Sequence, residues 1–79
     1  MSVSKDRLRA LLDERFGVPA ADITDEATFE ELALDSLILV EFALVVRKEF
    51  GIALDSWELE PSFTVKDAAE LVDAKAALV

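Results

Sequence analysis

The sequence predicts an all-α domain with three full helices and one short one. Only two Gly and two Pro occur among 79 residues, and 53% of the residues are hydrophobic, which favours a folded helical core over disorder. Apolar residues recur at helical spacing in three separate stretches. A chain of this length holds one hydrophobic core, so we expect residues 1–79 to form a single domain.

The first helix is predicted over Lys5–Phe16. Ser4 can act as its N-cap, and Gly17 marks its end. The inward-facing stripe consists of Leu8, Leu11, Leu12 and Phe16.

A long acidic connection follows and runs to Asp35. Thr28 and Glu31 form a capping-box pattern for a single helical turn. Four apolar side chains can hold the connection against the core: Ile23, Phe29, Leu32 and Leu34. Its carboxylates could bind a divalent ion weakly, but their spacing does not fit an EF-hand, and we favour a solvated acidic loop without metal: Asp22, Asp25, Glu26, Glu30 and Glu31.

The second helix is the best predicted element and should run from Ser36 to Phe50. Asp35 is a good N-cap, and Gly51 should end the helix. At about 100° per residue, one side gathers the core residues Leu39, Phe42, Ala43, Val46 and Phe50.

The other side of this helix is also apolar, at Leu37, Val40 and Leu44, with Glu41 beside them. A helix that is apolar nearly all round is either fully buried or offers a surface to a partner. A small domain cannot easily bury every side of it, so we favour a docking surface. Coverage by another helix is the alternative.

The C-terminal third predicts a short third helix and a longer fourth one. Asp55 or Ser56 can begin the short helix, which Pro61 should close. Thr64 should cap the last helix, with Asp67 as an imperfect capping-box partner. The inward stripe of the last helix is Val65, Ala68, Ala69 and Val72.

Charge and composition restrict the function. With 17 acidic and 8 basic residues the net charge is −9, which disfavours binding to nucleic acid. The absence of His and Cys removes the usual bases, nucleophiles and zinc ligands, so we expect no catalytic residue and no enzyme. No stretch resembles a membrane span or a signal peptide, which makes the cytoplasm the expected location.

Ser36 is the notable candidate site residue. It stands at the first position of the second helix, where backbone N–H groups lack partners and the helix dipole is positive. A phosphate esterified to its hydroxyl would be stabilised there.

The chain as a whole resembles an acyl carrier protein. The resemblance rests on Leu32-Ala33-Leu34-Asp35-Ser36-Leu37, followed by Val40-Glu41 and by Phe50-Gly51-Ile52 at the end of the helix. It implies a four-helix bundle with a short third helix and a long first loop, and a 4′-phosphopantetheine arm from coenzyme A attached covalently to Ser36. By analogy, Asp35 serves recognition by the phosphopantetheinyl transferase, partly around a magnesium ion.

The same resemblance implies that acyl groups are held as thioesters on the arm. Partner enzymes such as acyl transferases and ketosynthases would then contact Leu37, Val40, Glu41 and Leu44. We expect a monomer, and Met1 with the compact ends favours a free-standing protein. Carriers of this family can fold the acyl chain between their helices. Trp57 could line such a cavity, although an ordinary core position is the favoured expectation.

Two departures from the family pattern affect the expected pathway. Ala33 replaces a usual Gly, which could change the turn before Asp35. Ile38, Arg47 and Lys48 stand where acids are common, so the docking surface is less negative than that of fatty-acid carriers. We therefore expect polyketide or other specialised biosynthesis. An aminoacyl or peptidyl carrier and, in a different class, an unmodified helical adaptor are the alternatives.

Overall fold

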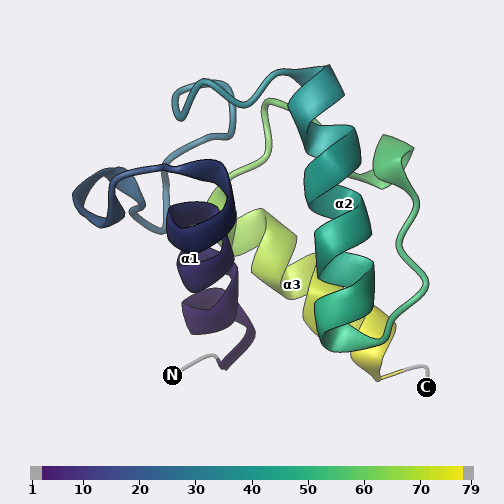
Figure 1. Ribbon diagram of the computed structural model, residues 1–79. Coiled ribbons are helices and arrows are strands. Elements are labelled where there is room, and N and C mark those ends of the chain that lie inside the picture. The colour runs from purple at the N-terminus through teal and green to yellow at the C-terminus, as the bar shows by residue number, and fades with distance from the viewer. Residues whose placement is uncertain (1–2, 78–79) are drawn as a thin grey trace.

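A computed structural model of the chain describes residues 3–77 and is all-α, as predicted (Figure 1). The order of elements is α1 (Val3–Phe16), the 3₁₀ turn η1 (Ala20–Asp22), α2 (Ser36–Phe50), the 3₁₀ turn η2 (Ser56–Glu58) and α3 (Val65–Ala76). Within residues 3–77 the only β-type pairing is an isolated bridge between Thr28 and Thr64. No helix in this range is long and apolar enough to cross a membrane.

The predicted short third helix is a single 3₁₀ turn, η2, so the described chain contains three α-helices. Leu54 and Leu59 on either side of η2 are both buried, which leaves one turn of chain to bridge them. This arrangement turns Trp57 outward, with 76% of its surface exposed. The expectations that Trp57 is a core residue or lines a cavity are therefore wrong.

One hydrophobic core joins the three helices and the long connection. The predicted inward stripes of the helices are confirmed at most positions, with Phe16 and Phe50 only half-buried. Phe42 of α2 is fully buried and packs edge-on against Phe16 at 5.4 Å and against Phe29 at 5.7 Å between ring centroids. Aromatic edge-to-face contacts of this kind add to the burial of apolar surface. The contacts of Phe16 and Phe29 with Phe42 therefore hold α1 and the long connection against the buried face of α2.

The start of α1 differs from expectation. Ser4 lies inside the helix, which begins at Val3, so Ser4 is not its N-cap. Its hydroxyl donates instead to the carboxylate of Asp73 on α3. This contact is long-range in sequence, which explains why the local capping pattern was misleading.

The long connection is held by backbone hydrogen bonds to the segment before and at the start of α3. Phe29 and Glu30 donate to the carbonyls of Phe63 and Pro61, at 3.0 and 2.9 Å. In return, Val65 donates to Ala27 at 3.1 Å. The middle of the connection, residues 25–30, is therefore anchored to the start of α3, which helps to fix where α2 begins.

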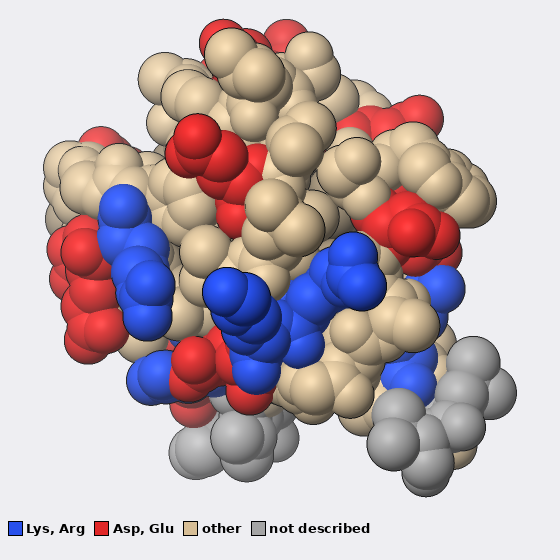
Figure 2. Space-filling view, turned by 45° about the vertical axis from the view of Figure 1, so that its right-hand side comes forward, with Lys and Arg blue, Asp and Glu red and all other residues tan. Residues whose placement is uncertain are grey.

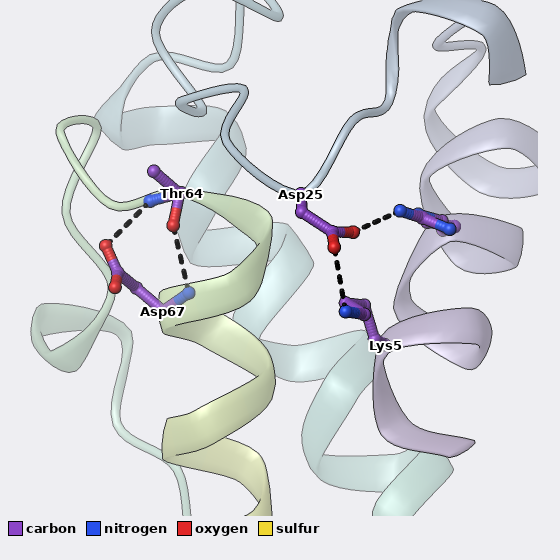
Figure 3. A network of polar contacts seen from close by, with 5 residues as sticks. Lys5, Asp25, Thr64 and Asp67 are labelled. Atoms are coloured by element: carbon purple, nitrogen blue, oxygen red, sulfur yellow. Dashed lines mark hydrogen bonds and ion pairs between the residues drawn. The ribbon is translucent and has the colours of Figure 1, made fainter. Parts of the chain in front are cut away.

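Two polar clusters complete the anchoring (Figure 3). Asp25 accepts from Lys5 at 2.8 Å and also from Arg9, which ties the connection to α1. The predicted capping box at the start of α3 is confirmed: Thr64 and Asp67 exchange backbone-to-side-chain hydrogen bonds of 3.1 and 3.0 Å.

Candidate functional site

The candidate site is the N-terminal end of α2. As predicted, α2 begins at Ser36, and the Asp35 side chain caps it by accepting from the Ile38 N–H at 2.9 Å. Asp35, Ser36 and Leu37 are all exposed. Among residues 3–77, no side-chain hydrogen bond involves the Ser36 hydroxyl, and Ser36 is exposed to solvent.

The local backbone makes this end of α2 a favourable place for an anionic group. The Leu39 N–H donates to the Asp35 carbonyl at 2.9 Å, so the regular helical hydrogen bonds begin there. The N–H groups of the first turn that precede it have no carbonyl one turn back. Together with the positive end of the helix dipole, they stabilise a negative charge placed beside Ser36.

The turn before α2 is closed by several hydrogen bonds, and its geometry explains the exposed position of Ser36. The Thr28–Glu31 capping box is confirmed, with both backbone-to-side-chain bonds present at 2.9 and 3.2 Å. The Thr28 hydrogen bonds also hold the pKa of the Glu31 carboxyl below its usual range. Leu34 is buried beneath this turn, so the next two residues emerge at the surface.

Ala33 ends this turn in the left-handed region, with φ of 63°. The Leu34 N–H donates to the Phe29 carbonyl at 2.9 Å, and the Ala33 N–H donates to the Glu30 carbonyl at 3.1 Å. This pair of bonds is the Schellman arrangement that usually has Gly at the left-handed position. Although Ala33 stands where Gly is usual, the turn keeps its hydrogen bonds. Ala33 itself is strained by its left-handed backbone.

The outer face of α2 is exposed, as the sequence predicted. The exposed fractions of Leu37, Val40 and Leu44 are 74%, 41% and 51%, and Glu41 is exposed beside them. No other helix of the described chain covers these side chains. We call Leu37, Val40 and Leu44 the apolar strip.

A wide groove of about 1230 Å³ is lined by the end of α1, the long connection and the first half of α2. Phe16 and Leu32 contribute apolar surface to it, while Ile38 and Glu41 contribute from the first half of α2. Leu34 and Ile38, two residues before and two residues after Ser36, are among the lining residues of the groove.

The acidic connection is less uniformly solvated than expected. Asp25 is held between Lys5 and Arg9, and the hydrogen bond from Lys5 is the main reason that its pKa is lowered. Lys5 and Arg9 lie one helical turn apart, a pattern that sequence analysis could have used to find this cluster. Among residues 3–77, no three potential ligand side chains are grouped to hold a metal ion.

Comparison with known proteins agrees with this geometry. The family described as "Phosphopantetheine attachment site" matches residues 6–74. The chain is similar to an acyl carrier protein of Thermobifida fusca, with 37% identity over 68 residues that cover 85% of this chain and 86% of the relative. It is also similar to an acyl carrier protein of Nitratidesulfovibrio vulgaris, with 34% identity over 76 residues that cover 95% and 99% of the two chains.

Proposed function

The chain belongs to the acyl carrier proteins, a family with a phosphopantetheine attachment site, and we propose that Ser36 is the residue that bears the arm. Members of this family are carriers rather than enzymes, and their cofactor is covalent 4′-phosphopantetheine. The observation that carries the assignment is an exposed hydroxyl at the first residue of α2, capped by Asp35.

The residues of the site fit a phosphodiester on Ser36. The hydroxyl supplies the oxygen, and the unpaired N–H groups of the first turn with the helix dipole stabilise the negative charge. When bound, the arm supplies the thiol that this Cys-free chain lacks and holds acyl groups as thioesters. Because the turn before Ser36 is anchored to the segment that leads into α3, the chain provides a firm base for a flexible arm.

Asp35 has two proposed roles in this site. In the folded chain it caps α2, and only one of its carboxylate oxygens is engaged by Ile38. The rest of the exposed carboxylate remains accessible to a phosphopantetheinyl transferase. We assign to Asp35 the recognition of that enzyme.

The apolar strip with Glu41 is proposed as the surface that acyl transferases, ketosynthases or related enzymes contact. Its exposure next to the arm supports this assignment, because a partner that docks there reaches the cargo. The low negative charge of α2 favours a dedicated pathway, such as polyketide synthesis, over bulk fatty-acid synthesis. Growth of a strain lacking its fatty-acid carrier on this chain alone would contradict that preference.

The remaining proposals concern the whole molecule. We propose one carrier domain over residues 1–79, which the single hydrophobic core supports. We also propose that it acts as a monomer in the cytoplasm. The turn η2 takes the place of the short third helix of a four-helix bundle.

The attachment site is tested by intact mass after incubation with coenzyme A and a phosphopantetheinyl transferase. We expect one phosphopantetheinyl group on the wild type and none on Ser36→Ala. Ser56→Ala is a matched control, because Asp55-Ser56 also stands at the start of a helical turn, η2. Modification of Ser36→Ala, or its loss in Ser56→Ala, would contradict the assignment.

Loading distinguishes the two kinds of carrier. After modification, we expect a malonyl transferase to load the chain. Preferential loading by an amino-acid-adenylating enzyme would favour an aminoacyl or peptidyl carrier.

A further inference from the structure

The charge of α2 differs from that of the rest of the molecule. The chain has a net charge of −9, but α2 contains two acidic residues, Glu41 and Glu49, and two basic ones, Arg47 and Lys48. The excess negative charge therefore lies entirely outside α2. A partner approaching α2 meets a surface that is locally neutral and apolar.

The ion pairs of α2 leave its C-terminal half positive. Glu49 pairs with Arg7 of α1, which neutralises the acidic residue nearest the end of the helix. Arg47 and Lys48 are both exposed, and the ion pairs found within residues 3–77 include neither of them. Two adjacent cations thus face solvent beside the apolar strip.

Helical geometry brings these cations to the edges of the strip. At about 100° per residue, Lys48 falls within about 40° of Leu44 and Leu37, while Arg47 falls beside Val40 on the other edge. The apolar strip is therefore flanked by positive charge at its C-terminal end. Figure 2 shows blue side chains across the lower centre of one face of the molecule, with tan surface above and between them and red side chains below and beside them.

Arg47 and Lys48 line a hollow at the C-terminal end of α2. It has a volume of about 350 Å³ and is lined by Leu44, Arg47, Lys48 and Ile52. Ile52 is buried, so the hollow has an apolar floor and a basic rim. Such a site accommodates the apolar stem of a partner side chain while its carboxylate meets the rim.

The helix dipole gives a partial reason for Arg47 and Lys48, because cations in the last turn of a helix are favourable. That effect falls off within the last turn and does not depend on the apolar strip. It favours cations at both positions, but it does not account for the exposed Leu44 and the hollow that lie beside them.

We infer that the apolar strip, together with Arg47 and Lys48, docks a partner protein whose surface is apolar at its centre and acidic where it meets the C-terminal half of α2. The partner's identity as an enzyme of acyl biosynthesis rests on the proposed function, whereas the charge of its docking surface rests on α2 alone. Apolar contact would supply affinity, and the charges would set the orientation of the partner.

The test uses two synthetic helical peptides about four turns long, each with Leu at helical spacing along one face. One peptide has Glu beside the Leu residues, and the other has Lys at the same positions. Amide NMR shifts of the full chain report the site and the affinity of binding. We expect the Glu peptide to shift residues 37–48 despite the net charge of −9, and the Lys peptide to bind this face less tightly.

Variants identify the cations responsible. Arg47→Gln with Lys48→Gln should weaken binding of the Glu peptide by about three- to tenfold at low salt, and salt at about 0.5 M should remove most of the difference. Arg15→Gln is the matched control, because Arg15 is also an exposed cation in the last turn of a helix, α1, and should leave binding unchanged. Circular dichroism checks that each variant is folded.

Two results would overturn the inference: the Lys peptide binding α2 at least as tightly as the Glu peptide, or equal effects of the Arg15 and Arg47–Lys48 variants. Neither result depends on modification of Ser36, because the peptides bind the chain without its arm. A failure of the docking inference is therefore distinguishable from a failure of the proposed attachment site.

Discussion

At the scale of single residues, Ala33 shows how one side chain can be strained without changing the fold. Its φ of 63° is required by the hydrogen bonds that close the turn between Thr28 and Leu34. An L-residue with a Cβ pays an energetic penalty there, and Gly does not. The turn survives because Phe29 and Leu34 are both buried and hold its ends in place.

Ala33→Gly should therefore stabilise the protein by roughly 0.5–1 kcal/mol, since relief of the left-handed strain exceeds the added entropy of the unfolded chain. Urea unfolding followed by circular dichroism measures this change. Ala74→Gly, at an exposed position inside α3, should have the opposite sign and destabilise by roughly 0.5–1 kcal/mol. Equal destabilisation by both variants would show that Ala33 is not strained.

At the scale of elements, the N-terminus of α2 combines a structural and a functional requirement in Asp35. The side chain caps the helix, and in the proposed function its carboxylate is also recognised by the modifying enzyme. These two requirements can be separated, because Asn caps a helix about as well as Asp but has no charge.

Asp35→Ala should lower stability by about 1 kcal/mol through loss of the cap, while Asp35→Asn should change it by only a few tenths. Asp35→Asn should nevertheless slow transfer of the arm to Ser36 by about tenfold or more, because the modifying enzyme loses a charge-assisted contact with the carboxylate. Chemical unfolding and the initial rate of modification provide the two measurements. A normal rate with Asn would limit Asp35 to its structural role.

At the scale of the whole molecule, the ion cluster around Asp25 joins the long connection to α1. Lys5 and Arg9 lower the pKa of the Asp25 carboxyl below its ordinary value of 3.8. A carboxyl whose pKa is lower in the folded state stabilises the fold above its unfolded-state pKa, and this stabilisation is lost as the pH falls through the folded-state value.

Asp25→Asn should therefore be less stable than the wild type at pH values above about 5, and the difference should shrink as the pH falls below 3.8. Thermal unfolding at several pH values measures the difference. Asp22→Asn serves as the control, because Asp22 is an exposed acid of the same connection and lies outside the ion pairs found in the described residues. A constant difference for Asp25→Asn across this range would contradict the assigned role.

Much of the fold was predictable because it depends on local patterns. Helical periodicity identified the buried stripes of all three α-helices, and the polar residues Asp35 and Thr64 marked the starts of α2 and α3 correctly. The exposure of the apolar strip also followed from the sequence, since a small domain cannot bury every side of α2.

Features that depend on contacts between distant segments were decided only by the tertiary structure. Ser4 donates to Asp73 rather than capping α1, and Trp57 faces solvent because Leu54 and Leu59 occupy the core around η2. Packing also decided which charged side chains of α2 are paired. Arg7 of α1 pairs with Glu49 of α2, whereas Arg47 and Lys48 have no carboxylate partner among the described residues. Local periodicity and capping are encoded in neighbouring residues, whereas these contacts join residues that only the folded core brings together.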